Sequence, residues 1–241
     1  MMRVFLGVTT AFGLAAGGMM AVDATRTAPS VEKASYFTEE AQLSPRRLII
    51  GLDISKSNPL IVDRQFASKV GTKIADMIRG MGFASEVHVR TFGSYDASFN
   101  SFYYDAQLST RDRPEGVAGE VYKLISGTPD LVERGRFHPQ NRTNIIAFLE
   151  NVHDAIGCSG MPTTIVLASD GIEDSEYARL DDPDSHLPPS DGKPYKGCAE
   201  LRILGIGQGT HSPTKTERLR REWERWAYAA GFAQFSGLND W

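Results

Sequence analysis

The chain has 241 residues, of which 41% are hydrophobic, and a formal net charge of −4. This length suits one main domain with a full core, so neither a metal nor a disulfide is needed merely for folding. The mildly acidic balance and the lack of a basic stripe argue against nucleic-acid binding. The basic residues between Lys215 and Arg225 alternate with glutamates, as is typical of a solvated helix.

The N-terminus has the features of a secretory signal. Arg3 precedes an uncharged stretch over residues 4–22, and the small residues that follow suit a signal peptidase. We therefore expect a signal peptide over residues 1–24, a linker over 25–47, a domain over 48–241, and a periplasmic or secreted location. An uncleaved anchor in the inner membrane is the alternative, because the stretch is just long enough to span a bilayer. No cysteine lies near the processing site, which excludes a lipoprotein.

The first half of the predicted domain alternates between strands and helices. A continuous apolar run over 48–53 predicts a strand covered on both faces. Apolar residues at helical spacing predict a helix over 63–80, with Gly82 as its stop. Strands over 85–92 and 99–108 are joined by a short connection, which predicts an antiparallel pair.

The second half continues this alternation. In chain order it predicts a helix over 117–125, a helix opened by Thr143 and ended by Gly157, a strand over 163–168, a long polar loop up to Gly197, a strand over 201–206, a helix over 214–230, and a short strand over 233–238. The fold class is therefore α/β, with a doubly wound, mostly parallel sheet and one antiparallel edge strand.

Five oxygen-bearing side chains fall where ligands bind in such sheets, beyond the carboxyl ends of the strands. Asp53, Ser55 and Ser57 directly follow the first strand, Thr143 lies at the start of a helix, and Asp170 follows the strand over 163–168. Carboxylate and hydroxyl oxygens suit Mg²⁺, which takes oxygen ligands in near-octahedral geometry. The order of these residues predicts a magnesium site.

The same residues resemble the von Willebrand factor A domain and its metal-ion-dependent adhesion site. That family carries Asp-x-Ser-x-Ser after the first strand, a Thr from a later loop, and an Asp ending a later strand, usually before Gly. The resemblance implies a Rossmann-like fold, with Ser55, Ser57 and Thr143 binding Mg²⁺ directly and Asp53 and Asp170 acting largely through coordinated water. Mn²⁺ or Ca²⁺ are alternative ions.

A cation held by neutral hydroxyls keeps much of its charge and favours an anionic oxygen from outside. We therefore expect an exported protein-binding module whose partner presents an Asp or Glu carboxylate, with no catalytic residue of its own and no nucleic-acid partner. A membrane is a partner only if the N-terminal segment stays uncleaved. A metal-dependent hydrolase is one alternative, and a domain of the same fold without a bound metal is another. The five histidines are scattered and predict no zinc site.

Two further features remain. Cys158 and Cys198 each precede a predicted parallel strand, so a disulfide is plausible if the strands are neighbours; two separate thiols are the alternative. Acidic residues crowd the loop over 173–191 on the same side as the metal site. The loop is either a solvated excursion or a border of the site that restricts which partners reach it.

Overall fold

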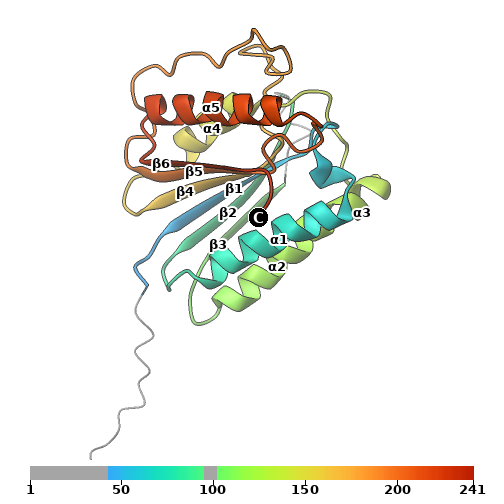
Figure 1. The fold of residues 1–241 in the computed structure, drawn as a ribbon. Coiled ribbons are helices and arrows are strands. Elements are labelled where there is room, and N and C mark those ends of the chain that lie inside the picture. Colours follow the sequence, from blue (N-terminus) through green and yellow to red (C-terminus); the bar gives the residue numbers. More distant parts are fainter. Residues whose placement is uncertain (1–42, 95–101) are drawn as a thin grey trace, which may run out of the picture. The chain divides into compact units, whose positions relative to one another are not determined.

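The computed structural model describes residues 43–94 and 102–241 (Figure 1). The predicted signal peptide over 1–24 and most of the predicted linker lie outside the described residues. The strands are β1 (Arg47–Asp53), β2 (Glu86–Phe92), β3 (Tyr103–Gln107), β4 (Thr163–Ala168), β5 (Cys198–Leu204) and β6 (Gln234–Leu238). The helices are α1 (Arg64–Arg79), α2 (Pro114–Ser126), α3 (Thr128–Glu133), α4 (Ile145–Ala155) and α5 (Pro213–Ala230), with a 3-10 turn, η1, over Pro59–Ile61.

The sheet has the order β3-β2-β1-β4-β5-β6. All neighbours are parallel except β2 and β3, which are antiparallel. This confirms the predicted fold class. The chain leaves β1 toward β2 on one side and reaches β4 on the other, so the direction of strand order switches between β1 and β4. Ligands of doubly wound sheets bind at such a switch point.

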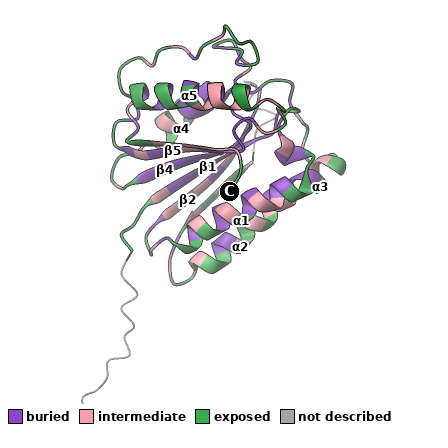
Figure 2. Ribbon diagram, viewed as in Figure 1, coloured by how far each residue is buried: buried purple, intermediate pink, exposed green. Residues whose placement is uncertain are grey.

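Helices cover the two faces of the sheet. In Figure 1, α1 and α2 lie on one side, and α4 and α5 lie on the other. Successive residues of β1 point to opposite faces, so Ile49 joins the core under α4 and α5, whereas Ile50 joins the core under α1 and α2. Figure 2 shows the resulting buried strands between partly exposed helices. A continuous apolar run is the expected sequence of such a strand.

Several boundaries differ from the prediction. The first helix ends at Arg79 with Gly80 as its C-cap, two residues before the predicted stop at Gly82. The prediction that Thr143 opens a helix is wrong, because α4 begins at Ile145 and its N-cap is Asn144, whose side chain accepts from the Ala147 amide at 3.0 Å. The Thr143 hydroxyl is therefore not used as a cap. The start of the predicted strand over 99–108 falls partly outside the described residues.

The disulfide between Cys158 and Cys198 is confirmed, with Cα atoms 5.1 Å apart. It joins the segment before β4 to the first residue of β5, which are neighbouring strands. The bridge therefore lies at the amino ends of the strands, opposite the predicted metal site. Across residues 43–94 and 102–241, the structure contains no helix with the length and apolar character that a bilayer crossing requires.

Candidate metal site

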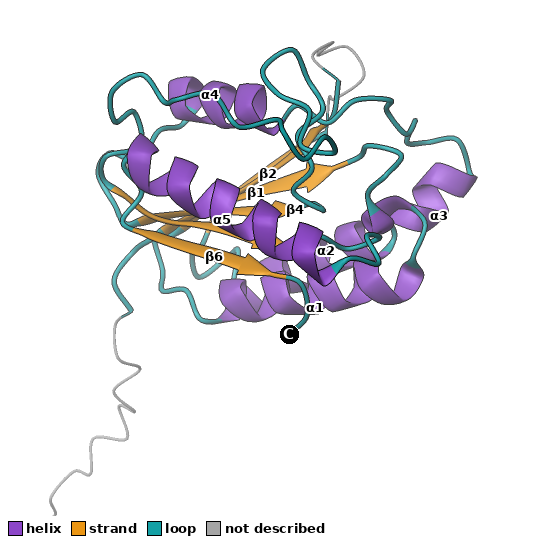
Figure 3. Cartoon of the chain, turned by 45° about the horizontal axis from the view of Figure 1, so that its top comes forward, coloured by secondary structure: helices purple, strands orange, loops and turns teal. Residues whose placement is uncertain are grey.

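Loops gather beyond the carboxyl ends of the parallel strands (Figure 3). Asp53 is the last residue of β1 and Asp170 lies two residues after β4; both side chains are buried, with 0% and 1% exposure. The Asp53 carboxylate accepts from the Ser55 amide at 2.8 Å and from the Ser169 hydroxyl at 2.7 Å. Because protein donors already hold it, Asp53 suits a role through water better than direct coordination.

The paired serines stand at the entrance of this site. The hydroxyl oxygens of Ser55 and Ser57 are 3.3 Å apart. Two adjacent ligands at about 2.1 Å from one octahedral Mg²⁺ would be about 3 Å apart, so the two hydroxyls fit one ion with little movement. Ser55 is buried and Ser57 is exposed and hydrogen-bonded to Asp170. The site therefore opens to solvent on the Ser57 side.

Thr143 lies on a loop that pairs with the segment just after β1. Gln140 pairs with the loop after β1, since its amide donates to the Ile54 carbonyl and its carbonyl accepts from the Lys56 amide, at 2.9 and 2.8 Å. Three residues later, Thr143 is only 2% exposed, and its hydroxyl makes no hydrogen bond within the described part of the chain. A buried hydroxyl without a partner is costly, and a cation ligand role would satisfy it.

The electrostatics favour a cation. Burial raises the pKa of Asp53 to about 6, and burial together with the charge of Asp53 raises the pKa of Asp170 to about 7. Both shifts mean that the two carboxylates resist ionising together. Lys215 lowers the pKa of Asp170 only as a minor influence, and its ammonium pairs with Asp181. A divalent cation between the carboxylates would stabilise their charged forms.

Asn58 is a structural residue of the site that the sequence did not single out. Its side-chain amide donates to the carbonyl oxygens of Asp53 and Ala168, at 2.7 and 3.0 Å, and its oxygen accepts from the Leu60 amide at 3.3 Å. It is fully buried and ties the ends of β1 and β4 together. An Asn after a strand indicates only a turn in the sequence, so no signal there predicts this cross-strand role.

Glu173 is the second residue that was missed. The interpretation of the acidic loop as a solvated excursion is wrong for this residue, because its side chain is fully buried. Its carboxylate accepts from the amides of Ile145 and Ile146 at the start of α4, at 2.8 and 3.2 Å, and from the Ser175 hydroxyl. A carboxylate at a helix N-terminus is favourable, although burial still raises its pKa to about 7. The acidic residues farther along the loop, Asp181, Asp182 and Asp184, are exposed.

The donor set is compatible with a hard cation. Among the residues that the structure describes, no group of three or more His, Cys, Asp or Glu side chains could hold a metal ion. The predicted site contains only two carboxylates, so it depends on the hydroxyls of Ser55, Ser57 and Thr143. Oxygen donors of this kind fit Mg²⁺ and lack the nitrogen or sulfur ligands that zinc prefers.

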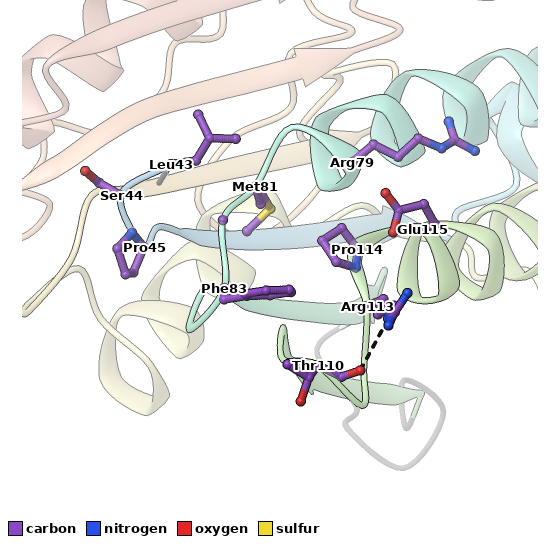
Figure 4. Close-up of a pocket in the computed structure, with 11 residues that line it drawn as sticks. Leu43, Ser44, Pro45, Arg79, Met81, Phe83, Thr110, Arg113, Pro114 and Glu115 are labelled. Atoms are coloured by element: carbon purple, nitrogen blue, oxygen red, sulfur yellow. Dashed lines mark hydrogen bonds between the residues drawn. The ribbon is translucent and has the colours of Figure 1, made fainter. Parts of the chain in front are cut away.

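A separate pocket of about 1290 Å³ lies at the other end of the sheet (Figure 4). It lies among Leu43 before β1, Arg79 at the end of α1, Phe83, and Arg113 and Glu115 around the start of α2. It shares no residue with the predicted metal site, and among the described residues that line it Glu115 is the one carboxylate. Its size alone does not connect it with cation chemistry.

Comparisons with known proteins identify no family. No family model matches the chain, and no curated protein matches it. A solved structure of an aerotolerance-related membrane protein from Bacteroides fragilis, carrying multiple mutations to serines, is similar at 14% identity with a TM-score of 0.41. The match covers 80% of this chain and 92% of that chain. At this level the similarity carries no functional argument, and the site must be judged from its own residues.

Proposed function

We propose that this protein is an exported, Mg²⁺-dependent protein-binding module that captures an Asp or Glu side chain of its partner. Ser55, Ser57 and Thr143 would hold the ion, and Asp53 and Asp170 would balance its charge largely through water. Mn²⁺ or Ca²⁺ could take its place. The observation that carries the proposal is the pair of buried carboxylates at the switch point of the sheet, with the Ser55 hydroxyl beside Asp53 and the Ser57 hydroxyl beside Asp170.

The charge balance supports a carboxylate as the missing ligand. With two carboxylates acting mostly through water and three neutral hydroxyls as direct ligands, the ion would keep much of its positive charge. The exposed Ser57 side of the site gives an outside group access. An anionic oxygen that excludes water there gains a stronger electrostatic contact than it has in bulk solvent.

Binding rather than catalysis is the function that the donor set favours. Hydrolysis would need a general base near the metal-bound water. Glu173 is the nearest additional buried carboxylate in sequence, but it already accepts from two backbone amides and one hydroxyl. Asp53 is similarly occupied by the Ser55 amide and the Ser169 hydroxyl. We therefore propose that the protein is not an enzyme.

An exported location agrees with the disulfide. Disulfides persist mainly in oxidising compartments such as the bacterial periplasm. The bridge between Cys158 and Cys198 is therefore consistent with the signal peptide that the sequence predicts. We propose a periplasmic or secreted protein, with an anchor in the inner membrane as the alternative.

Calorimetry with Mg²⁺ and Mn²⁺ tests the metal site directly. We expect one ion per chain in the wild type and none in a Ser55→Ala, Ser57→Ala double variant with an unchanged fold. The control is a Ser159→Ala, Ser190→Ala double variant, because neither of these serines contributes to the site. Wild-type ion binding that survives in the Ser55, Ser57 variant would contradict the assignment.

Relaxation measurements with Mn²⁺ test the open coordination position. Bound Mn²⁺ speeds the relaxation of water protons that exchange at its open position, and an incoming carboxylate displaces that water. We expect acetate to reduce this effect in a saturable way, whereas acetamide at the same concentration should not. If the relaxation effect is the same with both, the ion does not select carboxylates and the proposed function fails.

A further inference from the structure

The segment from Glu173 to Arg179 runs alongside the loop that carries Thr143. We infer that this segment, called the clamp segment below, fixes the position of Thr143, so that the order of the acidic loop and the occupancy of the metal site are coupled. The inference rests on the proposed metal site. It gives the acidic loop a role in regulating that site.

The inner contact of the clamp is Glu173. Its buried carboxylate accepts from the amides of Ile145 and Ile146, which begin two residues after Thr143. Glu173 itself lies three residues after Asp170 on the same chain segment. One short piece of chain thus contributes the second carboxylate of the site and anchors the helix that follows the predicted threonine ligand.

The middle contact joins the two backbones directly. The Asp174 amide donates to the Thr143 carbonyl at 2.9 Å, and the Thr143 amide donates to the Asp174 carbonyl at 3.3 Å. These reciprocal bonds form a small antiparallel bridge. Because the backbone of Thr143 is held on both its donor and its acceptor side, the backbone that carries its hydroxyl cannot move far unless the clamp segment moves as well.

The outer contacts hold the residues on either side of Thr143. Arg142 pairs with the Asp174 carboxylate at 3.1 Å, and Arg179 approaches the same carboxylate at 3.8 Å. On the other side, the side-chain amide of Asn144 donates to the Glu176 carboxylate at 3.3 Å. Exposed ion pairs of this kind contribute little stability by themselves. Their effect is to keep three consecutive residues of the site loop in register with the clamp segment.

Coupling between two parts of a molecule is reciprocal. If the clamp segment positions Thr143 for the ion, the bound ion must in turn stabilise the clamp segment. Residues that orient the ligands of a metal typically change its affinity by about 10- to 100-fold when they are removed. Glu173 is a positioning residue in this sense, because it acts on the ion only through the segment that carries Thr143.

The test compares Mg²⁺ affinity, by calorimetry, in Glu173→Ala, Glu173→Gln and wild-type protein. We expect Glu173→Ala to bind Mg²⁺ at least about 10-fold more weakly. Glu173→Gln retains an acceptor oxygen for the α4 amides and should stay within about threefold of the wild type. Asp184→Ala is the matched control, because Asp184 is an exposed acid of the same loop and its side chain forms no hydrogen bond or ion pair with the described residues of the clamp segment. It should bind like the wild type.

A second measurement uses only the wild type, in case Glu173→Ala does not fold. Saturating Mg²⁺ should slow hydrogen exchange at the amides of Asp174 and Leu180, which donate to Thr143 and Glu173 respectively. Wild-type affinity in a folded Glu173→Ala variant, or unchanged exchange at these two amides, would overturn the clamp while leaving the metal site standing. Failure of the wild type to bind any divalent cation would instead remove the proposed function, and the clamp inference with it.

Discussion

Without a bound divalent cation, the stability of this protein should depend strongly on pH. In the folded state the pKa of Asp170 is raised to about 7, against an ordinary value of 3.8. A carboxyl group with a raised folded-state pKa binds more protons when folded than when unfolded. The contribution of Asp170 to the free energy of unfolding is therefore most favourable below about pH 4 and is lost as the pH rises to about 7. In the absence of a divalent cation, the free energy of unfolding should fall across this range.

The size of the effect follows from the shift. A difference of about three pKa units at about 1.36 kcal/mol each corresponds to about 4 kcal/mol for Asp170. The raised pKa values of Asp53 and Glu173 act in the same direction, although coupled groups do not simply add. Bound Mg²⁺ would offset this loss, and an ion concentration of 100 times the Kd would give about 2.7 kcal/mol by mass action.

Urea denaturation of the oxidised protein measures both effects. The buried side chains of Trp223 and Trp226 provide a fluorescence signal for loss of the core. In EDTA, the urea midpoint should fall between pH 5 and pH 7.5, and Mg²⁺ should restore most of the loss at the higher pH. Asp170→Asn has nearly the same shape but no charge, so it should make the EDTA profile less steep, with Asp53 and Glu173 leaving a residual slope, and it should lose the response to Mg²⁺.

Asp184→Asn makes the same chemical change at an exposed position and should behave as the wild type in both respects. Two results would refute the reasoning. One is a wild-type midpoint in EDTA that stays level from pH 5 to pH 7.5. The other is stabilisation of Asp170→Asn by Mg²⁺ to the same extent as the wild type.

Three further changes separate the scaffold from the site. Replacing Cys158 and Cys198 by Ala should lower the free energy of unfolding in urea by on the order of 4 kcal/mol, because the bridge closes a loop of about 40 residues. Calorimetry should find an unchanged Mg²⁺ affinity in this variant. A large loss of affinity would contradict the placement of the bridge away from the site. Asn58→Ala removes three buried hydrogen bonds, so it should lower the free energy of unfolding by about 3 kcal/mol and also weaken Mg²⁺ binding. A stable variant with full Mg²⁺ affinity would count against the role of Asn58 in holding the ends of β1 and β4 together. Lys56→Glu reverses an exposed charge between the paired serines, and Lys56 makes no ion pair among the described residues. This variant should bind acetate more weakly in the Mn²⁺ relaxation assay, most strongly so at low salt. Equal acetate affinity in this variant and in the exposed control Lys193→Glu would argue against an anionic partner.

The architecture could be predicted because its signals are local. The apolar run 48–53 identified β1, and helical spacing from Phe66 onward identified α1. The disulfide followed from two cysteines placed before strands that proved to be neighbours. α3 and η1 were missed because each is short and begins around a proline, Pro129 and Pro59, where a loop is the more common interpretation.

The supports of the site could not be predicted in the same way. Asn58 acts across two strands that are 110 residues apart in sequence, and Glu173 acts on a helix that begins 28 residues earlier. Nothing in the neighbouring sequence distinguishes these residues from a turn asparagine or a solvated acid. The N-cap of α4 was misplaced by one residue for a related reason. Both Thr143 and Asn144 are good caps, and only the tertiary contacts of Thr143 with Asp174 decide between them.

These supports bear directly on how a cation would be held. Hydroxyl ligands bind more weakly than carboxylates, so their effect depends on being fixed in place before the ion arrives. Asn58 fixes the end of β1 against β4, and the pairing of Gln140 with the loop after β1 places the Thr143 loop beside the serines. The clamp segment then closes the remaining side through Asp174. The proposed ligands thus come from separate loops, but each loop is tied to its neighbour by buried or backbone hydrogen bonds. Binding of an ion here would therefore cost the loops little conformational entropy. Weak neutral ligands can suffice under this condition.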